Sequence, residues 1–165
     1  MPTGNFGDVL AGYYAKKMGL PMGKLVIATN ENDILARFWK SGRYEKVDSS
    51  QSGLQGSSTT DASGVKGTHS PAMDILVSSN FERLLWYLAF EDAEGNADAH
   101  GTACKTVEGW MSKVKSDGRV EVPVSVLEAA RRDFFAERIS DVLVSLSLGF
   151  LDRKIDGRYK DFEND

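Results

Sequence analysis

The sequence has little of what several functional classes require. Its 165 residues include a single cysteine, Cys104, which excludes an intrachain disulfide, and the flanks of Cys104 lack metal-ligand spacing. The two histidines, His69 and His100, are far apart among small residues, and we expect both in loops. A net charge of -4 supplies no broad basic surface for nucleic acid. No stretch is typical of a membrane span or a signal peptide, which favours a cytoplasmic protein without a membrane partner.

A turn bracketed by two glycines stands near the start of the sequence, at Thr3-Gly4-Asn5-Phe6-Gly7-Asp8, and an apolar pattern typical of a helix follows it. Because Gly4 and Gly7 have no Cβ, the main chain there can approach a ligand closely and adopt positive φ. The helix N-terminus adds unpaired N–H groups and the positive end of the dipole. The pattern predicts an anion site, but it is also typical of a plain tight turn.

Five segments of the sequence, in the same order, closely resemble threonine synthase of the fungal and enterobacterial type. They cover residues 2–8, 9–21, 28–33, 70–75 and 79–87. The resemblance extends over roughly residues 2 to 140. It implies an α/β fold of the fold-type II pyridoxal-phosphate enzymes (tryptophan synthase β-like), with helices packed on a small parallel sheet.

The resemblance also implies a function. The family converts O-phospho-L-homoserine and water into L-threonine and phosphate, the last step of threonine biosynthesis, with pyridoxal 5'-phosphate as cofactor. The loop holds the cofactor phosphate in that family, which assigns cofactor-binding roles to Gly4, Asn5, Phe6 and Asp8, with Gly7 as the backbone hinge. Because a carboxylate repels a phosphate, we expect Asp8 to accept hydrogen bonds from backbone N–H groups and to shape the loop.

No lysine of the chain has the context of the family's Schiff-base lysine, which is a Ser-Phe-Lys-Asp motif upstream of the loop. Lys16 and Lys17 are expected on the solvated side of a helix, and Lys24 at the start of a strand. We therefore predict no catalytic residue and no metal site in this chain. We therefore expect the chain to be an interior piece of the enzyme. Its missing partner is the remainder of the protein, without which we expect it to be inactive.

Periodicity predicts a helix, a strand and a helix in the first part of the chain, as expected for an α/β sheet that extends upstream. The strand, 25–28, is an uninterrupted apolar run that suits a parallel strand covered on both faces. Asn30 follows this strand, where open α/β sheets bind ligands, although it also suits a helix cap. The expected apolar positions of the two helices are Val9, Leu10, Tyr13, Tyr14, Met18, Ile34, Leu35, Phe38 and Trp39.

Further along the chain, helices are predicted from Phe81 and around 107–114, and an edge strand at 119–122. Residues 91–101 are expected to form a surface loop. Ser125 and Glu128 are spaced as a capping box for a helix that continues through Phe134 and Phe135 toward Ile139. Asp74, beside an apolar run, is expected to be partly buried and to cap a turn or pair with an arginine.

Composition suggests three regions. Residues 1–141 are interpreted as a partial catalytic domain, within which the Ser/Gly-rich stretch 47–69 is expected to be a flexible insertion. Residues 142–165 depart from the family pattern and are expected to be a poorly ordered tail, consistent with a truncated or mis-spliced gene product. Two alternatives remain: a non-catalytic remnant that binds phosphate or a nucleotide, and a structural module whose glycine turn serves only backbone geometry.

Overall fold

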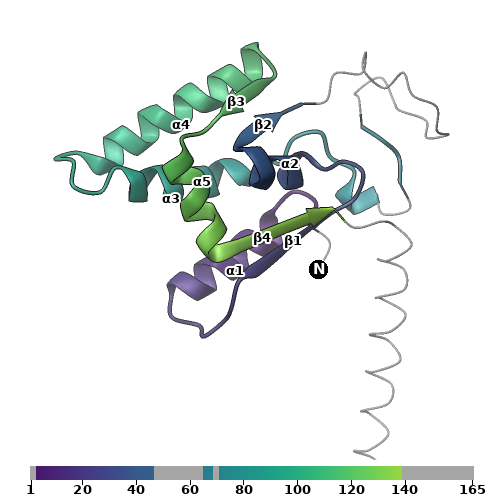
Figure 1. Ribbon diagram of the computed structural model, residues 1–165, viewed down its shortest axis with the longest axis horizontal. Helices are drawn as coiled ribbons and strands as arrows, with labels where there is room; N and C mark the ends of the chain where they lie inside the picture. The colour runs from purple at the N-terminus through teal and green to yellow at the C-terminus, as the bar shows by residue number, and fades with distance from the viewer. Residues whose placement is uncertain (1–2, 47–64, 69–70, 139–165) are drawn as a thin grey trace, which may run out of the picture.

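The computed structural model describes residues 3–46, 65–68 and 71–138, and it confirms the α/β class, with helices packed on a small parallel sheet (Figure 1). The expected insertion at 47–69, apart from 65–68, and the expected tail at 142–165 lie outside the described residues, as does His69. None of the described helices is long and apolar enough to cross a membrane.

The first three elements appear in the predicted order: α1 (Gly7–Lys17), β1 (Leu25–Thr29) and α2 (Ile34–Ser41). The apolar positions of α2 are buried as predicted. Gly42, at φ 74°, ends α2 in a left-handed conformation that glycine adopts without steric cost. Met18 was expected on the buried side of α1, but it is 87% exposed, since it lies past the last residue of that helix.

The parallel sheet pairs β1 with β4 (Phe134–Arg138), from Leu25 opposite Phe134 to Thr29 opposite Arg138. The prediction that the last helix continues through Phe134 and Phe135 is therefore wrong. Phe134 is buried and Phe135 is 51% exposed, which is the alternation of a strand. Val26, opposite Phe135, is 57% exposed, so the expectation that this strand is covered on both faces is also wrong for the described part of the chain.

A second, antiparallel pair joins β2 (Arg43–Glu45) to β3 (Arg119–Glu121). The edge strand predicted at 119–122 is confirmed, whereas β2 was not predicted. Tyr44 lies opposite Val120, and both side chains are buried. The pairing joins segments that are far apart in the sequence, which explains why three residues of β2 carry no strand signal of their own.

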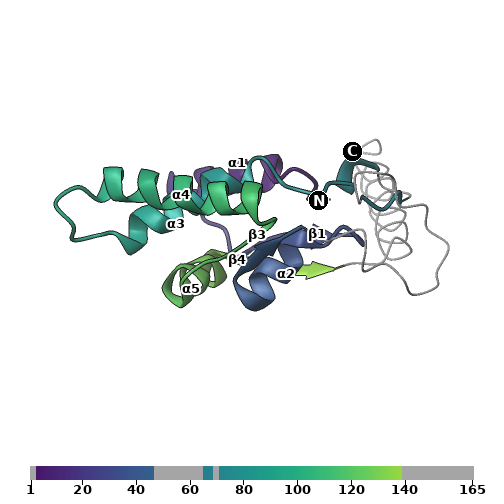
Figure 2. The same ribbon diagram turned by 90° about the horizontal axis from the view of Figure 1, so that it is seen from above.

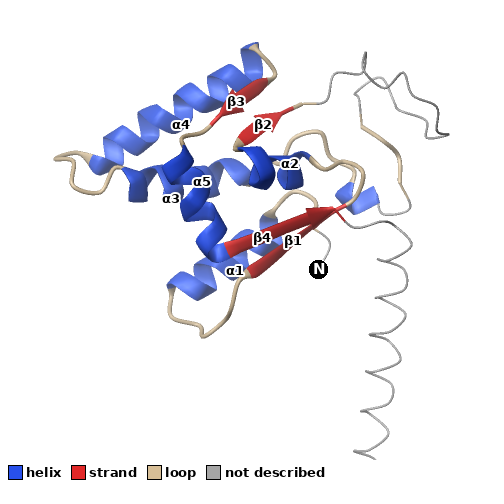
Figure 3. Cartoon of the chain, viewed as in Figure 1, coloured by secondary structure: helices blue, strands red, loops and turns tan. Residues whose placement is uncertain are grey.

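The remaining helices are α3 (Phe81–Asp92), α4 (Ala99–Ser116) and α5 (Val124–Asp133). Figure 2 shows α1, α3 and α4 along one side of the strands and α2 and α5 along the other, and Figure 3 distinguishes the helices from the strands by colour. The starts of α4 and α5 differ from two expectations. Helix α4 already begins within the expected loop 91–101, with the Asp98 side chain accepting from the Gly101 N–H. Pro123 precedes α5, so Ser125 lies inside the helix and forms no capping box.

An aromatic cluster joins four of these elements to the opening loop. The closest pair is Phe38 and Phe81, with ring centroids 4.8 Å apart. The rings come from the opening loop and from α2, β2, α3 and β4, so one cluster ties all five together. Its members are Phe6, Phe38, Trp39, Tyr44, Phe81 and Phe134.

Candidate functional site: the loop before helix α1

The loop turns into α1 through Phe6, which adopts a left-handed conformation at φ 64° and ψ 3°. The first helical hydrogen bond runs from the Leu10 N–H to the Phe6 carbonyl, at 3.0 Å. Positive φ was expected at Gly4 or Gly7, yet among the described residues of the loop it occurs at Phe6 instead. A left-handed residue beside right-handed ones is typical of backbone concavities that bind anions.

Burial explains how a phenylalanine keeps this conformation, which costs a non-glycine residue about 1–3 kcal/mol. The Phe6 side chain is 1% exposed. Its ring lies 5.6 Å from that of Phe81, 6.0 Å from Phe134 and 6.3 Å from Trp39. Fully burying a phenylalanine contributes about 1.5–3 kcal/mol, which is enough to offset the strain. Phe6 thus anchors the loop to the core while its backbone forms the turn.

Gly4 has a packing role that sequence reasoning did not foresee. It lies against the 3-10 helix η2 (Pro71–Met73), and a Cβ at Gly4 would overlap the carbonyl oxygen of Ala72. At Gly7 a Cβ would lie 3.6 Å from Asn80 Nδ2, an ordinary contact. The two glycines are therefore not equivalent, because only Gly4 is required by the close approach of another backbone segment.

Hydrogen bonds fix the loop at two further places. The Thr3 N–H donates to the Ala28 carbonyl of β1 at 3.1 Å, and the Ala28 N–H donates to Thr3 Oγ1 at 3.3 Å. The Asn5 side chain accepts from the N–H of Ser79 at 2.6 Å and from its hydroxyl at 2.9 Å. Asn80, which precedes α3, donates from Nδ2 to the Asn5 carbonyl.

The backbone N–H groups of Gly4, Asn5, Phe6, Gly7 and Asp8 have no hydrogen-bond acceptor among the described residues. Three of these groups stand at the opening of α1, where the helix cannot satisfy them and where its dipole is positive. The Asp8 side chain is exposed, and within the described chain it accepts no hydrogen bond from the loop backbone, contrary to expectation. The donor set suits an oxyanion of a ligand.

A polar cluster lies near the loop, beyond the end of β1. Asp74 is half-buried, as expected, but its partners are neutral rather than an arginine: Asn30, Asn32 and Thr68. Burial raises the pKa of Asp74, but the hydrogen bonds that its carboxylate accepts outweigh this effect and hold that pKa below its usual range. Asn30 is fully buried in the cluster and does not cap α2.

The three lysines near the loop in sequence are held elsewhere. Lys16 pairs with Asp133 at 2.8 Å, Lys17 pairs with Glu91 at 2.6 Å, and Lys24 donates to the Arg131 carbonyl at 2.9 Å. All three therefore have partners at α3 and α5 rather than in the loop.

Two residue types that can bind metals, His100 and Cys104, lie in α4. His100 lies in α4, not in a loop as predicted, and its Nδ1 is 3.8 Å from the sulfur of Cys104, one helical turn away. Trp86 donates to the same sulfur at 3.3 Å. The described residues contain no group of three or more His, Cys, Asp or Glu side chains that could hold a metal ion.

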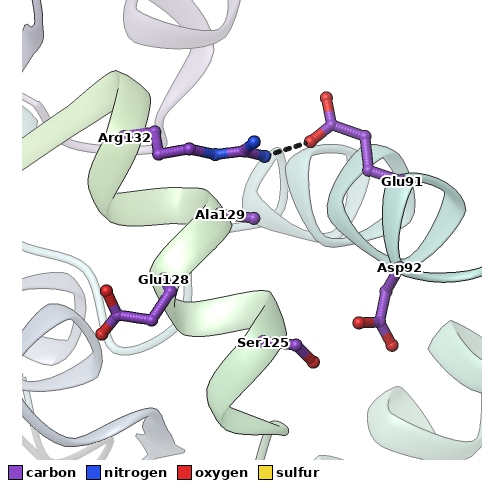
Figure 4. A pocket seen from close by; sticks show the side chains of 6 residues that line it. All are labelled: Glu91, Asp92, Ser125, Glu128, Ala129 and Arg132. Carbon is purple, nitrogen blue, oxygen red and sulfur yellow. Dashed lines mark hydrogen bonds and ion pairs between the residues drawn. The ribbon is translucent and has the colours of Figure 1, made fainter.

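A surface pocket of about 410 Å³ lies between α3 and α5, and none of its lining residues belongs to the loop (Figure 4). Arg132 and Glu91 form an ion pair at 2.8 Å across its edge. Because Glu91 also pairs with Lys17, these charges compensate one another and join three helices. We interpret the charged residues at this pocket as a structural network of ion pairs.

The chain is similar to several threonine synthases in sequence and in structure. No protein-family profile matches it. The threonine synthase of Schizosaccharomyces pombe is 54% identical over 165 residues, all of this chain and 29% of that protein. The threonine synthase of Saccharomyces cerevisiae is 52% identical over 141 residues, 86% of this chain and 24% of that protein. The resemblance was expected over roughly residues 2 to 140, and the second match has a similar length of 141 residues. The first match spans the whole chain.

Solved structures agree with the sequence matches. The crystal structure of threonine synthase from yeast superposes with a TM-score of 0.71 and 52% identity, covering 85% of this chain and 24% of that one. A pyridoxal-phosphate-bound threonine synthase from Brucella melitensis superposes with a TM-score of 0.66 and 42% identity. This match covers 84% of this chain and 24% of that one. Sequence and fold together place this chain in the threonine synthase family, as a segment that spans about a quarter of the length of these relatives.

Proposed function

We propose that Gly4, Asn5, Phe6, Gly7 and Asp8 form the cofactor-phosphate loop of a pyridoxal-phosphate-dependent threonine synthase. The observation that carries the proposal is the row of loop amides without acceptors in the described chain, at the positive end of α1. The similarity to an enzyme from Brucella melitensis described as bound to pyridoxal phosphate supports the identity of the anion.

In this proposal the backbone does most of the binding. The Asn5 side chain is engaged with Ser79, so Asn5 contributes its N–H group, as do Gly4 and Phe6. Each hydrogen bond from an amide to a phosphate oxygen contributes about 1.5–3 kcal/mol. The exposed carboxylate of Asp8 lies in the first turn of α1, where its negative charge interacts favourably with the positive end of the helix dipole.

The reaction proposed for the complete protein turns O-phospho-L-homoserine and water into L-threonine and phosphate, in the cytoplasm. Pyridoxal phosphate supplies the electron sink for carbanions at the substrate carbons. The chain's own part is to bind and orient the cofactor through its phosphate. Because Lys16, Lys17 and Lys24 are engaged elsewhere, we expect the isolated chain to form no threonine and to depend on the remaining parts of the enzyme.

Equilibrium binding of pyridoxal phosphate to the chain, followed by tryptophan fluorescence and by ³¹P NMR, tests the proposal. We expect binding that inorganic phosphate displaces and that Gly4→Asp abolishes. Gly109→Asp is the matched control, because Gly109 is exposed on α4 with nothing within 4 Å of an added Cβ. A lysine adduct trapped by borohydride would contradict the assignment of the lysines.

One observation favours a second candidate, a structural module. Gly4 is required by its contact with Ala72 whether or not a ligand binds. If this packing is the only role of the turn, neither pyridoxal phosphate nor inorganic phosphate will change the fluorescence or the ³¹P signal.

A further inference from the structure

The Asp74 carboxylate accepts four hydrogen bonds from neutral donors. Oδ1 accepts from Asn30 Nδ2 at 2.7 Å, from Thr68 Oγ1 at 2.7 Å and from Asn32 Nδ2 at 3.0 Å. Oδ2 accepts from the Thr68 N–H at 2.8 Å. No lysine or arginine of the described chain pairs with Asp74. Within the described part of the chain, its charge is thus stabilised by the three residues that it holds together.

These contacts join two segments that both touch the loop. On one side, Asn30 follows β1, and Ala28 in β1 binds Thr3 at the start of the loop. On the other side, Asp74 itself ends the turn whose Ala72 carbonyl packs against Gly4, with the Asp74 N–H donating to the Pro71 carbonyl at 3.1 Å. Asp74 therefore sets how far η2 lies from the end of β1.

We propose that Asp74 is a positioning residue for the loop 4–8: its carboxylate ties η2 to the residues after β1 and so fixes the Gly4 backbone between them. This inference rests on the proposed function for its consequence, which is the affinity for a phosphate group. In this proposal Asp74 acts on the loop and not on the ligand. Its effect passes through Ala72 on one side and through Asn30 and β1 on the other.

Asp74→Asn tests the inference. The substitution replaces one carboxylate oxygen, an acceptor, by an NH₂ group, a donor, and all the groups that contact this carboxylate are already donors. Asp92→Asn is the matched control, since Asp92 is exposed at the end of α3 and makes no hydrogen bond or ion pair within the described chain. If Asp74→Asn fails to fold, Asn32→Ala removes a single donor from the same carboxylate. Amide hydrogen exchange of the full chain, without ligand, is the first measurement.

The Thr3 amide donates to Ala28 and the Ser79 amide donates to Asn5, and these two hydrogen bonds fix the loop. We expect both amides to exchange roughly tenfold faster in Asp74→Asn, which is the effect of losing one charge-assisted hydrogen bond. The Gly101 amide, bonded to Asp98 in α4, serves as the internal reference and keeps its rate. Unchanged rates at Thr3 and Ser79 would overturn the inference. So would an equal increase at all three amides, since that result shows a loss of global stability instead.

Binding distinguishes this inference from the proposed function. With pyridoxal phosphate as the probe, Asp74→Asn is expected to raise Kd roughly tenfold and Asp92→Asn to leave it unchanged. If the unaltered chain binds neither pyridoxal phosphate nor inorganic phosphate, the proposed function fails, while the exchange rates still decide whether Asp74 positions the loop. If it binds and Asp74→Asn binds equally well, only the inference about Asp74 fails.

Discussion

The two loop glycines offer a direct test of how the loop is built. Gly4→Ala introduces a methyl group that would overlap the Ala72 carbonyl oxygen, and this oxygen belongs to a backbone held in place by Asp74. Gly7→Ala introduces the same methyl group at the first residue of α1, where its nearest neighbour, Asn80 Nδ2, is 3.6 Å away. Neither glycine has a positive φ, so the difference between the two variants is one of space alone.

The expected magnitudes follow from these contacts. Overpacking against a backbone that must shift costs about 1–3 kcal/mol, and we expect Gly4→Ala to lose that much unfolding free energy. Gly7→Ala changes a helical residue with room to spare, and its unfolding free energy is expected within about 0.5 kcal/mol of the original. At a urea m-value of about 1–3 kcal/mol/M, the first variant lowers the unfolding midpoint by roughly 1 M and the second leaves it almost unchanged.

Urea unfolding followed by tryptophan fluorescence measures both values, because Trp39 lies in the aromatic cluster against Phe6. An ¹⁵N spectrum of each variant shows whether the amides of η2 and of the loop move together. Equal midpoints for Gly4→Ala and Gly7→Ala would refute the reasoning, because they would mean that Ala72 does not confine the loop.

Four further predictions concern Phe6, Tyr44 and Asp74. Phe6→Ala should lower the unfolding free energy by about 3–5 kcal/mol in calorimetry, because it empties a core position and keeps the left-handed strain. Tyr44→Phe should cost about 1–3 kcal/mol in urea unfolding, since it leaves the buried Ser78 N–H, bonded to the Tyr44 hydroxyl at 2.8 Å, without an acceptor; a Ser78 amide that stays protected from exchange would contradict this. Because burial raises the pKa of Tyr44 to about 12, its stabilisation is complete below the unfolded value of about 10 and declines as the pH rises toward 12, so Tyr44→Phe should show a smaller alkaline loss. The pKa of Asp74 is lowered on folding. The stabilisation of the fold by its carboxylate is therefore complete above the unfolded pKa of about 3.9 and is lost as the pH falls through the folded pKa. The difference in unfolding free energy between the original chain and Asp74→Asn should shrink over that acid range.

Local patterns determined a large part of this fold. The apolar spacing of α2 and α3, the glycine that ends α2 and the edge strand β3 could all be predicted, because each depends on residues within one or two turns of chain. The motif at Gly4 to Asp8 likewise indicated the place of the candidate site, since a glycine turn before a helix presents amides through local geometry alone.

The tertiary structure decided the rest. Phe134 and Phe135 suit a helix by their sequence, and only the ladder with β1 makes them a strand. The left-handed residue is Phe6 because the core holds its ring, and Gly4 is needed because Ala72 lies against it. Asp74 was recognised as a half-buried carboxylate, but its partners Asn30 and Asn32 come from the segment after β1. Such contacts join residues that lie far apart along the chain, and no local pattern encodes them.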